Sequence, residues 1–395
     1  MTTERKLYLD PNLHIAFAVT LMVVMGVTSI APAFPDMAKA LNIPYNSVAM
    51  LVTIFTLPGI ILTPLLGILS DHVGRKKILA PSLLVFGIAG GACFFIRDFQ
   101  LLLVFRFIQG VGASGLGAIN VTIIGDLFKG PERTEAFGYN ASVLSIGTAI
   151  YPSLGGAMAL LGWNYPFLLP FSAIIVAFFV MFRLNNPEPL QQQELKSYFG
   201  SIWKIIKNPY VIGLFIGSIA TFVLIYGAMI TYYPLVMEQR FDATTVTIGL
   251  VMSAMSVSTA IAATQLARLT NKFSEKNLIK YGFLLLAISF VIVAFAEEMW
   301  VMVIAALITG AGNGINTPSL LSLLTSSTPT EYRGAVMSLN GMALRIGQTL
   351  GPLFMAFFYT IFGLCHAFCA AAVFTLIMIS IIFTLIRKDE VTRYD

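Results

Sequence analysis

The stretch Gly67-Ile68-Leu69-Ser70-Asp71-His72-Val73-Gly74-Arg75-Lys76-Lys77-Ile78-Leu79 decides how the chain folds. Four of its residues are charged and lie between two long apolar runs: Asp71, Arg75, Lys76 and Lys77. Such a cluster predicts a short hydrophilic turn that joins two membrane-spanning helices. Gly74 permits a tight turn, and Gly67 would let a neighbouring helix approach closely.

The composition of the whole chain indicates an integral membrane protein. Of its 395 residues, 57% are hydrophobic and only 11% are charged, whereas soluble domains carry about 25% charged residues. The apolar runs are continuous over roughly 20 residues, which favours spanning helices over the alternating strands of a barrel. Cys93, Cys365 and Cys369 lie within apolar runs, so we expect no disulfide framework.

Twelve apolar runs predict an all-α multi-pass membrane protein with twelve transmembrane helices in two pseudo-symmetric six-helix bundles. The runs cover residues 13–36, 46–69, 77–96, 99–125, 136–160, 164–183, 209–236, 243–269, 277–296, 299–325, 334–361 and 364–386. The longest hydrophilic stretch divides them six and six. We therefore expect a first bundle over 1–183, a cytoplasmic linker over 184–208, and a second bundle with a short cytoplasmic tail over 209–395.

The basic residues predict how the chain is oriented in the membrane. If the N-terminus is inside, most of the 24 Lys and Arg residues fall in inner segments, and the outer segments hold Lys39, Arg97 and Arg240. Loops rich in Lys and Arg stay on the cytoplasmic side. Both termini are therefore expected in the cytoplasm and the protein in the cell membrane. The N-terminus has no signal-peptide pattern, so we expect the first run to be a true span.

The second half of the chain repeats motifs of the first at an offset of 200 residues. In the copy of the opening stretch, Asn271 replaces Asp71 and Glu275 replaces Arg75. Identical residues recur at this spacing: Gly110 and Gly310, Arg133 and Arg333, Asn140 and Asn340, Gly147 and Gly347, and Pro152 and Pro352. Two parallel repeats are a transporter architecture with a central site at their interface.

Three segments resemble the major facilitator superfamily, and the resemblance covers the whole chain. The opening stretch is similar to the family's signature loop between the second and third helices. Arg106-Phe-Ile-Gln109-Gly110 resembles its fourth-helix motif. The fifth run is similar to the motif of the family's twelve-helix drug:proton antiporters and supplies four residues of interest: Gly147, Pro152, Gly155 and Gly156. Tyr151 departs from that motif, because it occupies the position of a glycine.

Two arginines lie inside the predicted spans. Arg106 is ~10 Å deep and Arg345 is ~17 Å into a core of ~30 Å. A guanidinium keeps its proton, so a buried one needs carbonyl, water or anionic partners. For Arg106 the resemblance implies a structural or proton-coupling role. For Arg345 two readings stay open: an interhelical hydrogen-bonding residue, or a cavity residue that meets the substrate.

The acidic residues are informative because all nineteen fall near helix ends, in loops or in tails. Asp36 and Asp126 are therefore the candidates for a titrating carboxylate in a proton antiporter. The resemblance implies that Asp126 pairs with Arg75 at the inner face, which leaves Asp36 as the coupling candidate beside Arg106. Asp71, Arg75 and Asp126 are predicted to form a latch, with Asp71 near the start of the eleventh helix at Arg333-Gly334.

Polar residues in the middle of the helices outline a predicted cavity. The expected substrate-binding residues are Arg345, Asn313, Asn340, Gln348 and Tyr226, with Asn120, Asn140 and Asn316 nearby. The chain also contains 31 Phe and 17 Met. An apolar, aromatic cavity with few polar groups suits bulky amphipathic compounds.

The resemblance implies a secondary active transporter that exports drugs or small amphipathic metabolites in exchange for protons. The alternatives are an exporter or exchanger of organic anions, a lipid flippase, and a proton-driven importer. The chain has no pattern of a metal cluster or catalytic triad, so an enzyme or receptor is disfavoured. We expect a monomer that needs a small-molecule substrate, a lipid bilayer and a proton gradient, with no cofactor and no nucleic acid.

Overall fold

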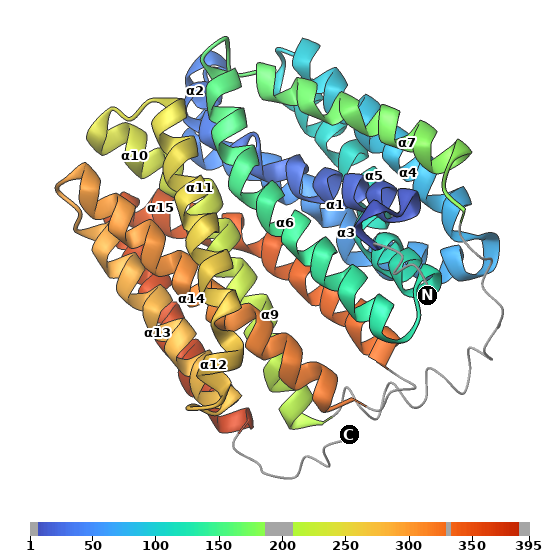
Figure 1. The fold of residues 1–395 in the computed structure, drawn as a ribbon. Helices are drawn as coiled ribbons and strands as arrows, with labels where there is room; N and C mark the ends of the chain where they lie inside the picture. The colour runs from blue at the N-terminus through green and yellow to red at the C-terminus, as the bar shows by residue number, and fades with distance from the viewer. Residues whose placement is uncertain (1–6, 186–207, 329–332, 387–395) are drawn as a thin grey trace.

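The computed structural model describes residues 7–185, 208–328 and 333–386, and the regular structure within these ranges is helical (Figure 1). In the first half of the chain the elements are η1 (Leu7–Leu9), α1 (Pro11–Thr28), η2 (Ala31–Ala33), α2 (Phe34–Ala40), α3 (Tyr45–Val73), α4 (Arg75–Ala92), η3 (Cys93–Phe95), α5 (Phe99–Leu127), α6 (Gly130–Ala159), η4 (Tyr165–Phe171) and α7 (Ser172–Phe182).

The described residues of the second half are also helical, with a different set of short elements. The elements are α9 (Pro209–Leu224), the π-helix η5 (Ile225–Tyr232), α10 (Tyr233–Phe241), α11 (Thr245–Thr264), α12 (Leu266–Thr270), α13 (Glu275–Ala294), α14 (Met299–Ser326) and α15 (Arg333–Ile386). α9, η5 and α10 continue one another and form one span.

The described residues confirm the twelve predicted helices. Ten helical stretches are long and apolar enough to cross a membrane. One of them, α15, is two helices joined at Gly363, whose φ of 79° breaks the helical path. α6 completes the set: it is as long as its neighbours but begins with the polar stretch Gly130-Pro131-Glu132.

The turn between α3 and α4 has the predicted form. Gly74 has φ 110° and ψ 137°, a conformation that side-chain-bearing residues rarely adopt, so the two helices reverse direction at one residue. The expectation for Gly67 is wrong in this arrangement. A Cβ placed on Gly67 would have no neighbour within 4 Å, so no other helix approaches closely at this residue.

The two bundles lie side by side and meet along two helix pairs, α6 with α11 and α3 with α15. We call these pairs the seam. The molecule has a Lys39 end, where α2 and α10 lie, and an Arg75 end at the turn between α3 and α4. In Figure 1, α6 and α11 are close beside α2 and diverge towards the opposite end. The bundles are therefore in contact at the Lys39 end and splayed at the Arg75 end.

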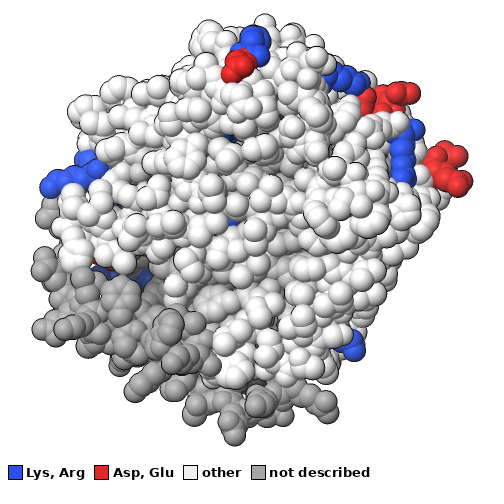
Figure 2. Space-filling model, turned by 180° about the vertical axis from the view of Figure 1, so that it is seen from behind, with Lys and Arg blue, Asp and Glu red and all other residues white. Residues whose placement is uncertain are grey.

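The surface fits a membrane environment. Figure 2 shows a broad white area with only small spots of blue, and most of the Lys, Arg, Asp and Glu side chains are near the rim of this face. Large apolar side chains that are exposed in the isolated chain include Ile61, Phe107 and Phe179. Lipid would cover such side chains in a bilayer, which explains why they are not buried in the protein.

Candidate functional site

The seam between α6 and α11 depends on glycines from both bundles. A Cβ on Gly156 would lie 2.3 Å from the Thr245 carbonyl oxygen, and one on Gly249 would lie 2.4 Å from that of Pro152. The hydroxyl oxygens of Ser153 and Ser253 are 2.6 Å apart. Pro152 and Gly156, predicted from the fifth-helix motif, therefore lie where one bundle touches the other.

The other two glycines of that motif pack inside the first bundle. A Cβ on Gly155 would lie 1.7 Å from the carbonyl oxygen of Ser29, and one on Gly147 would lie 2.9 Å from a methyl carbon of Leu21. The motif residues therefore lie on two faces of α6. Gly147 and Gly155 pack against the first bundle, and Pro152 and Gly156 contact the second bundle.

The seam between α3 and α15 is polar near the Lys39 end. The Thr53 hydroxyl donates to the carbonyl of Thr349 at 3.2 Å, and the hydroxyls of Thr56 and Thr349 are 2.8 Å apart. The Asn46 amide donates to the hydroxyl of Thr360 at 3.1 Å. These short side chains let two helices from different bundles approach closely and share hydrogen bonds.

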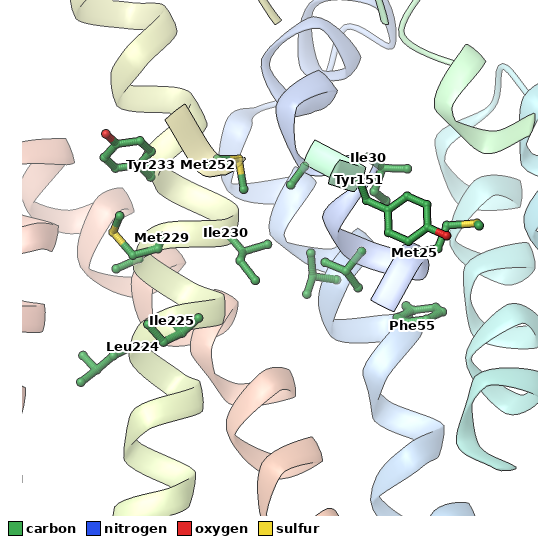
Figure 3. Packing of buried hydrophobic residues seen from close by; sticks show 14 of the residues in the cluster. Met25, Ile30, Phe55, Tyr151, Leu224, Ile225, Met229, Ile230, Tyr233 and Met252 are labelled. Atoms are coloured by element: carbon green, nitrogen blue, oxygen red, sulfur yellow. The ribbon is translucent and has the colours of Figure 1, made fainter. Parts of the chain in front are cut away.

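Buried apolar side chains from both bundles fill the space between these contacts. Figure 3 shows them in two groups, one in each bundle: Met25, Phe55 and Tyr151 in the first bundle, and Ile225, Ile230 and Met252 in the second. Tyr151, the residue that departs from the family motif, belongs to this cluster.

Arg345 lies on the seam, near the middle of its helix. A Cβ on Gly59 of α3 would lie 2.9 Å from Arg345 Cδ and 3.0 Å from its Nε, so the absence of a side chain at Gly59 makes room for the arginine. Nη1 of Arg345 donates to Oε1 of Gln348 at 3.0 Å. The side chain is partly exposed, and within the described part of the chain it forms no ion pair.

Tyr226 lies close enough to Arg345 for an electrostatic interaction. Its ring stacks on Phe222, with centroids 5.8 Å apart and an interplanar angle of 22°. Tyr226 belongs to the π-helix η5, where the Thr231 hydroxyl donates to its carbonyl at 2.7 Å. π-helical turns are rare and often occur at functional sites. The structure therefore brings together three of the predicted binding residues, Arg345, Gln348 and Tyr226.

The other two predicted binding residues form no hydrogen bond with this group in the described part of the chain. Asn313 is on α14, where its Oδ1 accepts a hydrogen bond from Thr317 of the same helix at 2.8 Å. Asn340 is buried, and its Oδ1 has no partner. In the first bundle, the equivalent Asn140 accepts from Thr20 at 2.6 Å.

Two more of the asparagines expected near the cavity join helices inside a bundle. The Asn120 amide donates to the carbonyl of Ala16 at 3.0 Å and to the hydroxyl of Thr20 at 2.8 Å. The Asn316 amide donates to the hydroxyl of Thr221 at 2.8 Å. Both asparagines are buried, so their contacts explain their place at membrane depth.

Arg106 is fully buried inside the first bundle. Its Nε donates to the carbonyl of Leu51 at 3.2 Å, and Nη1 donates to the carbonyl of Gly26 at 2.9 Å and to Oε1 of Gln109 at 2.7 Å. The guanidinium also lies 4.2 Å from the ring centroid of Phe55. One side chain thus joins α1, α3 and α5.

At the Arg75 end, Arg75 joins two carboxylates of its own bundle. Its Nε donates to Asp126 at 2.9 Å, the contact predicted from the sequence, and Nη1 contacts both Asp71 and the hydroxyl of Ser70. Asp71 is half-exposed. Its expected neighbours at Arg333-Gly334 have side-chain positions outside the described set. In the described ranges, no three His, Cys, Asp or Glu side chains gather to hold a metal.

At the Lys39 end, an ion pair that sequence reasoning did not identify joins the bundles. Lys39 of α2 contacts the carboxylate of Glu238 of α10, and Tyr45 donates its hydroxyl to the same carboxylate at 3.1 Å. Asp36 interacts electrostatically with both Lys39 and Glu238. Lys39 and Glu238 each follow the end of a predicted helix on the same side of the membrane. Their common depth was the feature of the sequence from which this ion pair could have been predicted.

Comparison with known proteins identifies the family. The family model described as "Major Facilitator Superfamily" matches residues 16–246 and 214–394. The chain is 27% identical to the bacillibactin exporter of Bacillus subtilis (strain 168), over 86% of this chain and 88% of that one. It is 24% identical to the class B tetracycline resistance protein of Escherichia coli, over 89% of each chain.

Solved structures share the fold. A bacterial homologue of the human lysosomal transporter Spinster, in an inward-facing and unoccupied conformation, superposes with a TM-score of 0.82 at 16% identity, over 98% of this chain and 99% of that chain. The human organic anion transporter MFSD10 gives 0.71 at 17% identity, over 96% and 100%. The chain belongs to the major facilitator superfamily and is a multi-pass membrane protein that transports small molecules, not an enzyme.

Proposed function

We propose that this transporter exports small amphipathic compounds from the cytoplasm in exchange for protons. The observation that carries the proposal is the position of Arg345, a partly exposed cation on the seam between two bundles that meet at one end. A substrate held there would be reached from one side at a time as the bundles rock. Among the similar proteins, one is named as a bacillibactin exporter and others as tetracycline and quinolone resistance proteins, which supports export as the direction.

The Arg75 end is proposed to face the cytoplasm, with both termini on that side. This orientation rests on the Lys and Arg residues of the short loops. The arrangement described above is then open towards the cytoplasm, ready to take up a substrate. The moving units are the bundles over 1–183 and 209–395, joined by the segment 184–208, most of which lies outside the described residues.

Opening the Lys39 end requires the seam contacts there to separate. The ion pair of Lys39 with Glu238, the hydrogen bond from Tyr45 and the Ser153–Ser253 contact all join one bundle to the other. The proton is proposed to act here, at Asp36 beside Lys39 and Glu238. Protonation of a carboxyl removes its attraction for Lys39 and so weakens the closed end.

Arg106 is proposed to contribute to coupling through the helices that it joins, because a guanidinium does not release its proton. Asp71, Arg75 and Asp126 are proposed to form the latch of the Arg75 end. In the splayed arrangement these side chains bind one another within the first bundle. The half-exposed Asp71 carboxylate is then available to contact the second bundle when that end closes.

The test is transport by the purified protein in liposomes, with and without an imposed pH gradient, using a panel of amphipathic compounds. We expect a gradient that is acidic on the Lys39 side to drive substrate towards that side. The Asp36→Asn variant should lose this response and keep downhill exchange. Transport that ignores the gradient in the unmodified protein would remove proton coupling from the proposal.

Orientation is tested separately by labelling with a membrane-impermeant thiol reagent. In a background with Cys93, Cys365 and Cys369 replaced by Ala, Lys39→Cys should be labelled from outside intact cells. Lys76→Cys should be labelled only after the membrane is opened. The reverse pattern would invert the proposed topology.

A further inference from the structure

The surroundings of Arg345 contain more hydrogen-bond donors than acceptors. A guanidinium has five N–H donors and no acceptor, and the protein acceptor that Arg345 contacts is Oε1 of Gln348 at 3.0 Å. Tyr226, which interacts with Arg345, adds a phenolic hydroxyl. The acidic residues of the described ranges stand at or near helix ends, where Glu238 pairs with Lys39, and Asp71 and Asp126 pair with Arg75. The positive charge of Arg345 is therefore left for a ligand to neutralise.

The structure also holds the Arg345 side chain in place. Gly59 leaves space for the arginine stem between α3 and α15, as the 2.9 Å distance from a Cβ there to Arg345 Cδ shows. Gln348, one turn along α15, holds Nη1. A guanidinium fixed from two sides presents its remaining N–H groups in a planar fork, which matches the two oxygens of a carboxylate.

An apolar surface adjoins the charge. Tyr226 and Phe222 stack with centroids 5.8 Å apart, and Tyr226 interacts electrostatically with Arg345. A Cβ on Gly347, two residues beyond Arg345, would lie 2.7 Å from Phe222 Cβ. A flat apolar group could lie along these rings while an attached anionic group reaches the guanidinium. The site thus offers a cation and an aromatic surface side by side, and within the described residues it offers no carboxylate for a cationic ligand.

We propose that the substrate is an amphipathic organic anion whose carboxylate, or similar oxyanion, binds Arg345 while its apolar body packs along Tyr226 and Phe222. This inference rests on the proposed function, because it assumes that the middle of the seam is the transport site. It narrows the substrate class: a cation of the same shape is repelled by the unpaired guanidinium. Because arginine stays protonated, the preference for anions is independent of pH between 6 and 8.

The experiment compares three probes with one apolar body: 1-naphthaleneacetate, its neutral amide 1-naphthaleneacetamide, and the cation 2-(1-naphthyl)ethylammonium. Binding to the full-length protein in detergent is measured at pH 6 and pH 8. We expect the anion to bind at least about ten-fold more tightly than the amide at both pH values, and the cation to bind most weakly. Equal binding of the three probes, or tighter binding of the cation, would overturn the inference.

Two variants connect the preference to Arg345. Arg345→Gln should bind the anion and the amide equally, whereas Arg345→Lys should keep a reduced preference for the anion, because an ammonium retains the charge but not the fork. Gly67→Ala, on the partner helix α3 of the same seam, is the control, because a Cβ there would meet no atom within 4 Å. Size-exclusion profiles establish that each variant is folded. If Arg345→Gln keeps the full preference while folded, Arg345 is not the anion site.

Transport of the same probes in liposomes separates this inference from the proposed function. If a pH gradient drives export of the cationic probe, and Arg345→Gln exports it as fast as the unmodified protein does, the inference is overturned. Proton-coupled export would still hold. Binding of the anion that depends on Arg345, with no export in either direction, would support the inference and overturn the proposed function.

Discussion

Two Arg-x-x-Gln segments lie at membrane depth, and the same local hydrogen bond occurs in both. Arg106 donates to Gln109 at 2.7 Å on α5, and Arg345 donates to Gln348 at 3.0 Å on α15. Arg106 is fully buried, binds two carbonyls of neighbouring helices and faces the ring of Phe55. Arg345 has none of these additional partners among the described residues, and it is partly exposed.

The difference shows that the position within the bundles, not the local motif, determines what a membrane-embedded arginine does. Inside one bundle, Arg106 is surrounded by helices that do not have to separate, so the carbonyls of Leu51 and Gly26 can hold its Nε and Nη1 permanently, although Nη2 has no hydrogen-bond partner among the described residues. On the seam, Arg345 lies between helices that belong to different bundles. A permanent partner there would hold the bundles together, whereas an unpaired guanidinium can bind and release a ligand.

The largest expected effect is on stability, from Arg106→Met. The change leaves the carbonyls of Gly26 and Leu51 and the amide oxygen of Gln109 without their donor, which should cost about 2–4 kcal/mol of unfolding free energy. Thermal unfolding in detergent measures this loss. Arg345→Met is the matched variant and should lose less than about 1 kcal/mol. Equal losses would mean that the two arginines have equivalent surroundings.

Gly59→Ala should impair binding more than stability. The added Cβ would lie 2.9 Å from Arg345 Cδ, but this neighbour is a flexible side chain that can move away. The guanidinium then shifts, and we expect 1-naphthaleneacetate to bind about three- to ten-fold more weakly. Gly67→Ala, where a Cβ would meet no atom within 4 Å, serves as control. If both variants bind like the unmodified protein, the placement of Arg345 does not depend on Gly59.

Gln109→Leu should cost about 1–2 kcal/mol of unfolding free energy, because it leaves the fully buried Arg106 with one acceptor fewer. The site is also tight: a Cβ on Gly90 would lie 2.3 Å from Nε2 of Gln109. Thermal unfolding measures the change, and binding of the naphthalene probes should be unaltered. A change in probe binding without a loss of stability would contradict the structural role of this pair.

The smallest effect is expected from Gln348→Leu. Arg345 is partly exposed, so water replaces the lost acceptor and the stability should change by less than about 0.5 kcal/mol. The guanidinium is less firmly held, and binding of 1-naphthaleneacetate should weaken about two- to three-fold. Binding titrations with the unmodified protein measured in parallel resolve this difference. A stability loss as large as that of Gln109→Leu would erase the contrast between the two pairs.

The sequence was a good guide to features that depend on neighbouring residues along the chain. Long apolar runs predicted the twelve helices, and Gly74 predicted the turn, because hydropathy and backbone conformation are local properties. The pairing of Arg75 with Asp126 was also predicted, from the resemblance to the family. The common position of Arg345, Gln348 and Tyr226 followed from their shared depth in the membrane.

Features that depend on the direction in which a side chain leaves its helix were not predictable. Asn340 and Gln348 both lie at membrane depth on α15, but Oδ1 of Asn340 has no partner in the described part of the chain, whereas Oε1 of Gln348 accepts a hydrogen bond from Arg345. The space that Gly59 provides for Arg345, and the pair of Lys39 with Glu238, join residues far apart in the chain. The prediction of close helix packing at Gly67 was wrong for a related reason. A small residue permits close packing, but in this arrangement a Cβ on Gly67 would have no neighbour within 4 Å.

The π-helix η5 gives its span a mechanical property of its own. A π-turn holds one more residue than an α-turn, because its bonds run from residue i to i+5 instead of i+4. If η5 returned to α-helical bonding, the residues beyond it would rotate by about 100° and shift by about 1.5 Å along the axis. α10, which follows directly, carries Glu238. A change from π-helical to α-helical bonding beside Tyr226 would therefore rotate α10 and turn the Glu238 carboxylate away from Lys39.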